Sequence, residues 1–191
     1  MNARAHGRMM GKGTAFSLVE LLVVIAVIGI LAAISLPVLN RAEESGRSTA
    51  CLSNLHQIGL ALQIYVDENK NTLPIMRDAP MDTNTVTTNV LPTVNVVLKN
   101  ELGNTNVLRC PSDIQGIFQL TGSSYSWNNL LNGENANNLV VMGMNFNPHA
   151  IPVFFDKEGF HALRGPNKAV NYLYADGHIK DLLTIEGTLP Q

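Results

Sequence analysis

Apolar residues are distributed unevenly along the chain, and the main feature is one long run near its start. No residue from Leu21 to Asn40 is charged, and the stretch Leu21–Ile34 is almost purely aliphatic. Twenty such residues in a helix span about 30 Å, which is the thickness of the hydrocarbon core of a bilayer. The pattern therefore predicts a helix that crosses a membrane.

The helical pattern continues beyond this run and becomes amphipathic. Pro37 lies inside it, and because no turn signal follows, we expect a kink rather than a helix end. Opposite charges then stand three and four residues apart, which predicts an exposed face with Glu43 and Glu44 in solvent. Apolar residues further on recur at helical spacing and predict the face on which a globular domain packs. The helix should run from Phe16 to about Glu68.

The remaining residues, 71–191, predict a small globular head. Asn95–Lys99 fits a short strand or a short helix. The run Ile151–Phe155 predicts a strand, and the proline within it favours a position near the edge of a sheet. The expected fold class is α+β, with a long N-terminal helix and a small antiparallel sheet on the second half of that helix.

A hairpin is predicted near the end of the chain. Asp176-Gly177 stands between two apolar runs and is a strong signal for a two-residue turn. Both turn residues would then have positive φ, and Tyr174 would face Ile179 across the hairpin.

Composition and charge narrow the class of protein. The chain has 191 residues, which suits one modest domain with an appendage. Of these, 46% are hydrophobic and 15% are charged, against roughly 25% charged in ordinary soluble proteins. Because the apolar excess is concentrated in one run, a simple cytosolic globule is excluded. The net charge of -2 gives no electrostatic case for a nucleic-acid partner.

The residues before the apolar run set its orientation. Met1–Thr14 carries Arg4, Arg8 and Lys12 and no acid, so the N-terminus should stay in the cytoplasm while the rest is exported. A cleaved secretory signal peptide is disfavoured, because the run is long and no clear Ala-x-Ala site follows it. A plain signal anchor is the other simple alternative.

A specific motif stands at the start of the run. The sequence Ala15-Phe16-Ser17-Leu18-Val19-Glu20-Leu21 places an acid at the edge of an apolar helix, where it needs a partner. With Pro37 further on, residues 12–40 resemble the N-terminus of type IV prepilins and type II secretion pseudopilins. That pattern has a small residue, usually glycine, before the phenylalanine, and Ala15 takes this place here.

The resemblance implies processing followed by assembly. A prepilin peptidase would cut between Ala15 and Phe16 and methylate the new amine of Phe16. In a filament, this ammonium would pair with Glu20 of a neighbouring copy, which neutralises a buried charge and fixes the register between subunits. Leu21 and Pro37 belong to the same motif and would lie in the filament core.

The implied organisation has four parts and a defined location. These are a basic leader (1–15), a hydrophobic core helix (16–40), its amphipathic continuation (41–70) and the head (71–191). The protein would cross the bacterial inner membrane once, with its head in the periplasm. Its partners would be prepilin peptidase, copies of itself, other pseudopilins, an inner-membrane assembly platform and, before assembly, membrane lipid.

The two cysteines, Cys51 and Cys110, can pair after export. Cysteine pairs outside the cytoplasm tend to be oxidised. A bond between these two would join the helix to the head and close a loop of about 60 residues, worth up to a few kcal/mol. Two buried free thiols are the alternative.

Several short motifs in the head resemble a large bacterial family with a prepilin-type N-terminus and a C-terminal processing-associated domain. They are Cys51–Leu55, Cys110–Asp113, Ser124–Asn128, Pro152–Asp156 and Asn171–His178. The domain is recognised by a histidine followed by Asp-Gly. Asp176-Gly177-His178 matches the second part, and His161 corresponds to the first, although the gap between His161 and Asp176 is longer than in the family pattern.

The head has metal-ligand residue types but no catalytic motif. The types that suggest zinc are Asp156, His161, Asp176 and His178. The hairpin turn accounts for an aspartate at position 176, and a position at the edge of a strand accounts for His178. His149 fits an ordinary surface residue. There is no His-x-x-x-His pair, Gly-x-Ser-x-Gly or phosphate loop. We therefore expect no catalytic site and no cofactor, with a structural calcium at Asp113, Asp156 or Asp176 as the weaker alternative.

Two functions follow from the sequence. The first is a non-catalytic, pilin-like subunit of a type II secretion filament or a type IV pilus. The alternative is a membrane-anchored binding or metal-dependent enzymatic domain that uses the helix only as a tether. A Glu20→Ala substitution distinguishes them, because only the first function needs this carboxylate.

Overall fold

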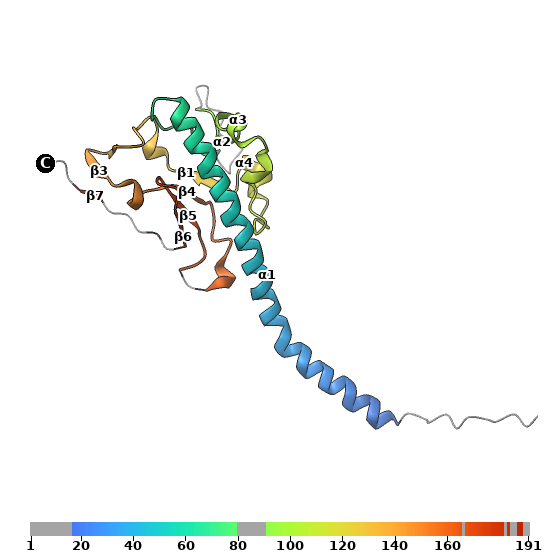
Figure 1. The fold of residues 1–191 in the computed structure, drawn as a ribbon. Coiled ribbons are helices and arrows are strands. Elements are labelled where there is room, and N and C mark those ends of the chain that lie inside the picture. Colours follow the sequence, from blue (N-terminus) through green and yellow to red (C-terminus); the bar gives the residue numbers. More distant parts are fainter. Residues whose placement is uncertain (1–16, 80–90, 166, 182, 184–186, 189–191) are drawn as a thin grey trace, which may run out of the picture. The chain divides into compact units, whose positions relative to one another are not determined.

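The computed structural model describes residues 17–79, 91–165, 167–181, 183 and 187–188 (Figure 1). The chain divides into two compact units, residues 1–40 and residues 41–191. Helix α1 contributes to both, so each part of it is described with its own unit. One long helix is followed by short strands and short helices, which makes the fold α+β and pilin-like, as predicted.

Helix α1 (Leu18–Glu68) is one continuous helix that includes Pro37. The predicted helix is thus confirmed from Leu18 onward, while Phe16 lies outside the described residues. Pro37 has no N–H to donate to the carbonyl four residues earlier. The nearby hydroxyl of Ser35 donates to the carbonyl of Leu31 at 2.8 Å.

Helix α1 ends at Glu68, and two residues with left-handed backbone follow shortly after it. Lys70 and Asn71 have φ values of 56° and 58°. The N–H of Asn71 donates to the carbonyl of Val66 at 2.9 Å, and the side chain of Asn69 donates to the carbonyl of Tyr65 at 2.8 Å. These bonds satisfy carbonyl groups that the last helical turn leaves free.

The strands form two small antiparallel sheets. The first has the order β1-β4-β5-β6, and the second has the order β2-β3-β7. Their bounds are Tyr125–Trp127 (β1), Leu139–Val141 (β2), Met144–Phe146 (β3), Pro152–Asp156 (β4), Tyr172–Tyr174 (β5), Ile179–Lys180 (β6) and Gly187–Thr188 (β7).

Short helices fill the connections. The α-helices are Val94–Val97 (α2), Lys99–Leu102 (α3) and Ile117–Thr121 (α4), and the 3-10 helices are Thr105–Leu108 (η1), Asn129–Leu131 (η2), Pro148–Ala150 (η3) and Ala162–Arg164 (η4). The segment around Asn95–Lys99, for which strand and helix were both open, is therefore helical.

Strand β4 is central, which corrects the expected edge position. It pairs with β1 on one side and with β5 on the other. Pro152 allows this because it is the first residue of the strand and lies at a register shift between Pro152 and Phe154. Proline is tolerated at a strand start or at a bulge, where no ladder N–H is required.

The predicted hairpin joins β5 and β6, but its turn differs from the prediction. Leu173, not Tyr174, pairs with Ile179. The N–H of Gly177 donates to the carbonyl of Tyr174 at 2.9 Å, and the N–H of Tyr174 donates to the carbonyl of His178. Within the turn only Gly177 has positive φ, at 88°. The loop therefore has three residues and ends in a left-handed glycine, which is another common hairpin class.

From Arg41 onward, one face of α1 is buried within the second unit. Its buried residues recur at helical spacing: Glu44, Ser48, Cys51, Leu55, Ile58, Ala61, Leu62 and Val66. A Cβ added to Gly59 would stand 3.3 Å from the methyl carbons of Leu173, so glycine allows α1 to approach β5 closely. The predicted packing face is thus confirmed.

A disulfide joins Cys51 of α1 to Cys110, 59 positions later, and both residues belong to the hydrophobic core. The same core holds Trp127, which is 2% exposed. The centroid of its ring lies 5.1 Å from that of the Phe154 ring. The hydroxyl of Tyr125 also donates to the carbonyl of Cys51 at 3.4 Å. A cross-link over a loop of this length contributes about 2–4 kcal/mol.

Candidate functional site

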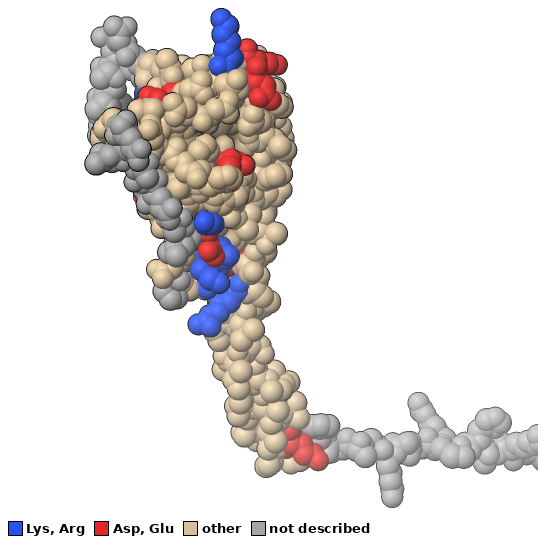
Figure 2. Space-filling view, turned by 60° about the vertical axis from the view of Figure 1, so that its left-hand side comes forward, with Lys and Arg blue, Asp and Glu red and all other residues tan. Residues whose placement is uncertain are grey.

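The first candidate site is the apolar part of α1. Every large aliphatic side chain from Leu18 to Leu39 is exposed, from 47% at Val24 to 78% at Leu18. Burying one such side chain is worth about 1.5–3 kcal/mol, so this surface strongly favours a non-aqueous environment. Figure 2 shows it as an uncharged surface with acidic atoms only at its beginning. Among the described residues, α1 is the one helix long and apolar enough to cross a membrane.

Glu20 is the one charged residue on this surface. Its Oε2 accepts a hydrogen bond from the backbone N–H of Ser17 at 2.9 Å, which satisfies a donor at the start of the helix. Leu21 and Pro37 are exposed on the same segment. The predicted cleavage residues, Ala15 and Phe16, lie outside the described part of the chain.

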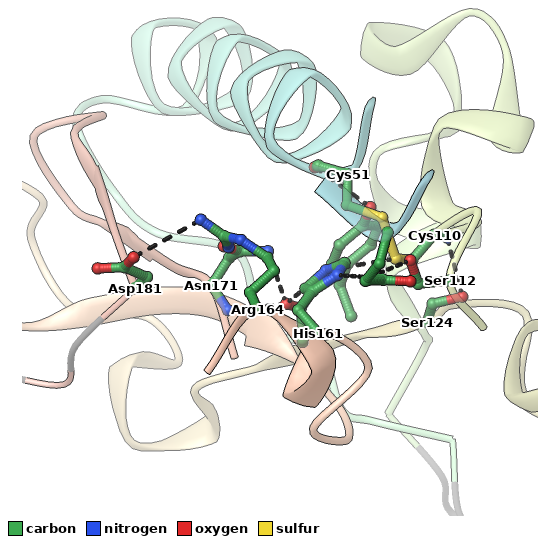
Figure 3. A network of polar contacts seen from close by, with 11 residues as sticks. Cys51, Cys110, Ser112, Ser124, His161, Arg164, Asn171 and Asp181 are labelled. Atoms are coloured by element: carbon green, nitrogen blue, oxygen red, sulfur yellow. Dashed lines mark hydrogen bonds and ion pairs between the residues drawn. A yellow bond between two sulfur atoms is a disulfide. The ribbon is translucent and has the colours of Figure 1, made fainter. Parts of the chain in front are cut away.

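The second candidate site is a buried polar network in the second unit (Figure 3). Glu44 is only 5% exposed, which contradicts its expected solvent position. Its Oε1 accepts hydrogen bonds from the Ser112 hydroxyl at 2.7 Å and from Nδ1 of His161 at 2.6 Å. Its neighbour Glu43 is exposed, as expected, and pairs with Arg47. Glu44 therefore ties α1 to two segments of the head.

His161 stands at the centre of this network and is fully buried. Its Nε2 lies 3.4 Å from Oδ2 of Asp156 and 3.7 Å from Sγ of Cys110. Oδ2 of Asp156 accepts from the backbone N–H of Asn171 at 2.7 Å and from its side-chain amide at 2.9 Å. The imidazole thus lies between two carboxyl groups and beside the disulfide.

Arg164 extends the network away from this centre (Figure 3). Its Nη1 donates to Oδ1 of Asn171 at 3.3 Å, and its Nη2 lies 3.7 Å from Oδ2 of Asp181. Because the Arg164 side chain is 20% exposed and that of Asp181 is 39% exposed, the network reaches the surface here.

Burial disfavours the charged forms of Asp156 and His161. Burial raises the pKa of Asp156 to about 7, although the two donors of Asn171 act in the opposite direction. Burial also lowers the pKa of His161 below 6.5, although the hydrogen bond to Glu44 acts against this. Nδ1 of His161 therefore faces Glu44, and its Nε2 faces Asp156.

Asp113 is one of the aspartates considered for a structural calcium. Both carboxylate oxygens of Asp113 accept protein hydrogen bonds, from the N–H groups of Ile117 and Phe118 at 2.9 and 2.7 Å and from the Ser124 hydroxyl. Within the described residues, no group of three clustered ligand atoms contains Asp113 or Asp156. Asp113 instead holds the start of α4.

The third candidate site lies at the surface, on the hairpin turn. Oδ2 of Asp176 contacts Nδ1 of His149, and its Oδ1 lies 2.5 Å from Nδ1 of His178. Partial burial acts to raise the pKa of Asp176, but hydrogen bonds from both histidines hold it below its usual value. The motif residues are therefore divided, because His161 belongs to the buried network and Asp176, Gly177 and His178 to this turn.

The sequence analysis assigned Glu44 to solvent and His149 to an ordinary surface position, and the structure places both in polar clusters. Glu44 stands four residues before Ser48 and seven before Cys51, a spacing that places it on the buried face of α1. His149 meets Asp176 because β4 pairs with β5, and no local pattern reveals that pairing.

Comparison with known proteins bears on the first site. Residues 10–36 match the family model described as the prokaryotic N-terminal methylation motif. The match includes the predicted processing site and most of the apolar run, and it supports the resemblance to prepilins and pseudopilins. The resemblance of the head to a processing-associated domain lies outside it and stays a prediction. No curated protein and no solved structure matches the chain.

Removing the acceptor at Glu44 should destabilise the second unit. In Glu44→Ala, the Ser112 hydroxyl and the His161 N–H lose their shared buried acceptor, which should cost about 1–3 kcal/mol of unfolding free energy. Urea unfolding followed by the fluorescence of the single tryptophan, Trp127, measures this. The matched variant Glu43→Ala should change the value by less than about 0.5 kcal/mol. Equal effects of the two substitutions would contradict the network.

The ionisation of Asp156 should make the second unit less stable as the pH rises. Its pKa is about 7 when folded and near 3.8 when unfolded, so its contribution is complete below pH 3.8 and is lost as the pH rises through 7. Between pH 5 and 8 the unfolding free energy should fall by about 2–3 kcal/mol relative to Asp156→Asn, which cannot ionise. Because Nε2 of His161 lies 3.4 Å from Oδ2 of Asp156, the two groups titrate together, so the difference reports the Asp156–His161 pair. Parallel pH profiles would refute this assignment.

Proposed function

We propose that this chain is the precursor of a non-catalytic, pilin-like filament subunit. The observation that carries the proposal is the coincidence of two features in one segment. Residues 10–36 match the N-terminal methylation motif, and the aliphatic side chains of the helix within that segment are exposed. A precursor of this class needs such a surface twice, first in lipid and later against other subunits.

The membrane is the first environment of the apolar helix. The segment from Leu21 to Asn40 is long enough to cross the hydrocarbon core, and the preceding basic residues favour a cytoplasmic N-terminus. Glu20 lies at the start of this segment, so its carboxylate can remain near the headgroups. The head would be in the periplasm of a bacterium.

Processing would convert the anchored precursor into a subunit. A prepilin peptidase would cut between Ala15 and Phe16, remove a leader with three basic residues and no acid, and methylate the new amine. The methylated amine stays cationic. Alanine is small, as the position before the cut requires.

Assembly would bury the apolar surface a second time. Transfer from lipid into a bundle of like helices exchanges one apolar environment for another, so little free energy opposes it. Gly29 helps, because its lack of a side chain allows a neighbouring helix to approach closely. The Glu20 carboxylate would pair with the Phe16 ammonium of an adjacent copy and so set the register.

The second unit would carry the outer surface of the filament. The disulfide and the Glu44 network fasten residues of the head to the second part of α1, so force on the helix would be passed to the head. Partners would be copies of this chain, other pilins or pseudopilins and an inner-membrane assembly platform. The filament would be of the type II secretion or type IV pilus kind.

Substituting Glu20 tests this function directly. In cells with active prepilin peptidase, Glu20→Ala should reduce incorporation into sheared filaments by at least about tenfold, because the ammonium would be buried without its counter-charge. Immunoblots of the filament and membrane fractions give the measurement, and Glu43→Ala is the matched control with an exposed acid.

The same experiment separates the filament subunit from a tethered binding or enzymatic domain. A filament subunit should assemble normally with Asp176→Ala, which removes a carboxylate from the head and leaves the apolar helix unchanged. Normal incorporation of the Glu20→Ala protein would overturn the proposal and favour a helix that serves only as an anchor.

A further inference from the structure

Three metal-ligand side chains meet at one surface of the second unit. They are His149, which lies in η3, and Asp176 and His178, which lie in and beside the turn between β5 and β6. One ligand atom from each lies within 4.8 Å of those of the other two. This spacing allows one ion to contact all three residues.

The pairing of β4 with β5 brings these residues together. Pro152, at the start of β4, is the partner of Tyr174, at the end of β5. The N–H of Ala175 then donates to the carbonyl of Ile151, which extends the contact toward the turn. Residues just before β4 therefore lie beside residues just after β5, so the meeting follows from the topology of the sheet.

Local contacts orient two of the three ligand side chains and fix the backbone of the third. The side chain of Asn147 accepts from the N–H of His149 at 3.0 Å and fixes the start of η3. Oδ1 of Asp176 accepts from the N–H of His178 at 3.2 Å. The ring of His178 stacks on that of Tyr174, with centroids 4.3 Å apart and planes 7° apart. Two of the three side chains are thus held in place without an ion.

We propose that His149, Asp176 and His178 bind a divalent first-row transition-metal ion, for which Zn²⁺ is the representative. Two imidazole nitrogens and one carboxylate oxygen are a ligand set that such ions accept, whereas calcium requires mostly oxygen ligands. This inference goes beyond the proposed function and does not depend on it.

The site is open on one side. The side chain of His149 is 71% exposed, that of His178 is 30% exposed and that of Asp176 is 18% exposed. Three protein ligands leave the fourth position of a tetrahedral ion for a solvent molecule. The cysteines do not compete for the ion, because both are in the disulfide.

Equilibrium dialysis of the metal-free full-length protein in detergent against Zn²⁺ tests the site. We expect one ion per chain in the wild-type protein. His149→Ala, Asp176→Ala and His178→Ala should each weaken binding by at least about tenfold, since even the loss of an outer partner of a metal ligand costs 10–100-fold. His56→Ala is the matched control, because it removes an exposed imidazole of α1 that is not in the cluster.

A second probe shows whether one ion contacts these residues together. Bound Co²⁺ should give a visible absorption band that disappears in the double variant His149→Ala/His178→Ala, while the fluorescence of Trp127 shows that the variant is folded. Absence of one-to-one Zn²⁺ binding by the wild-type protein would overturn the proposal. Binding that survives the double variant would overturn it as well.

Discussion

The need to keep the aliphatic surface of α1 out of water governs the rest of this protein. From Leu18 to Leu39 every large aliphatic side chain is exposed, and only Glu20 carries a charge. No fold of the second unit removes this requirement, because the buried face of α1 is confined to residues from Glu44 onward. One helix therefore has two surfaces with different tasks. Its first part needs lipid or other helices, and its second part forms the core of a small α+β unit.

The head is fastened to the second part of α1 by three kinds of interaction. Leu55, Ile58 and Leu62 belong to the hydrophobic core, and Cys51 forms a covalent bond with Cys110. Glu44 adds buried hydrogen bonds to Ser112 and His161. The apolar contacts are non-directional, whereas the disulfide and the polar network each require one register between helix and head. A buried polar group without its partner is costly, so the network disfavours other registers.

Much of the fold could be predicted from the sequence, and the errors have different causes. The extent of α1 and the presence of the β5–β6 hairpin follow from local patterns of polarity, spacing and turn residues, whereas the register of the hairpin and the closeness of Cys51 to Cys110 do not. The edge position expected for Pro152 was wrong because Pro152 is the first residue of β4 and lies at a register shift, where no ladder N–H is required. Glu44 was assigned to solvent from its charge, although its helical spacing from Cys51 places it on the buried face. The cluster of His149 with Asp176 was not foreseen, because it arises from strand pairing alone.

The mass of the mature N-terminus tests the central claim most directly. The protein would be isolated from membranes and filaments of a host with active prepilin peptidase, and its N-terminal peptide would be analysed by mass spectrometry. Our account predicts a chain that begins at Phe16 and carries one added methyl group on its amine. A chain that retains residues 1–15 in such a host would contradict the account and leave the apolar helix as a permanent membrane anchor.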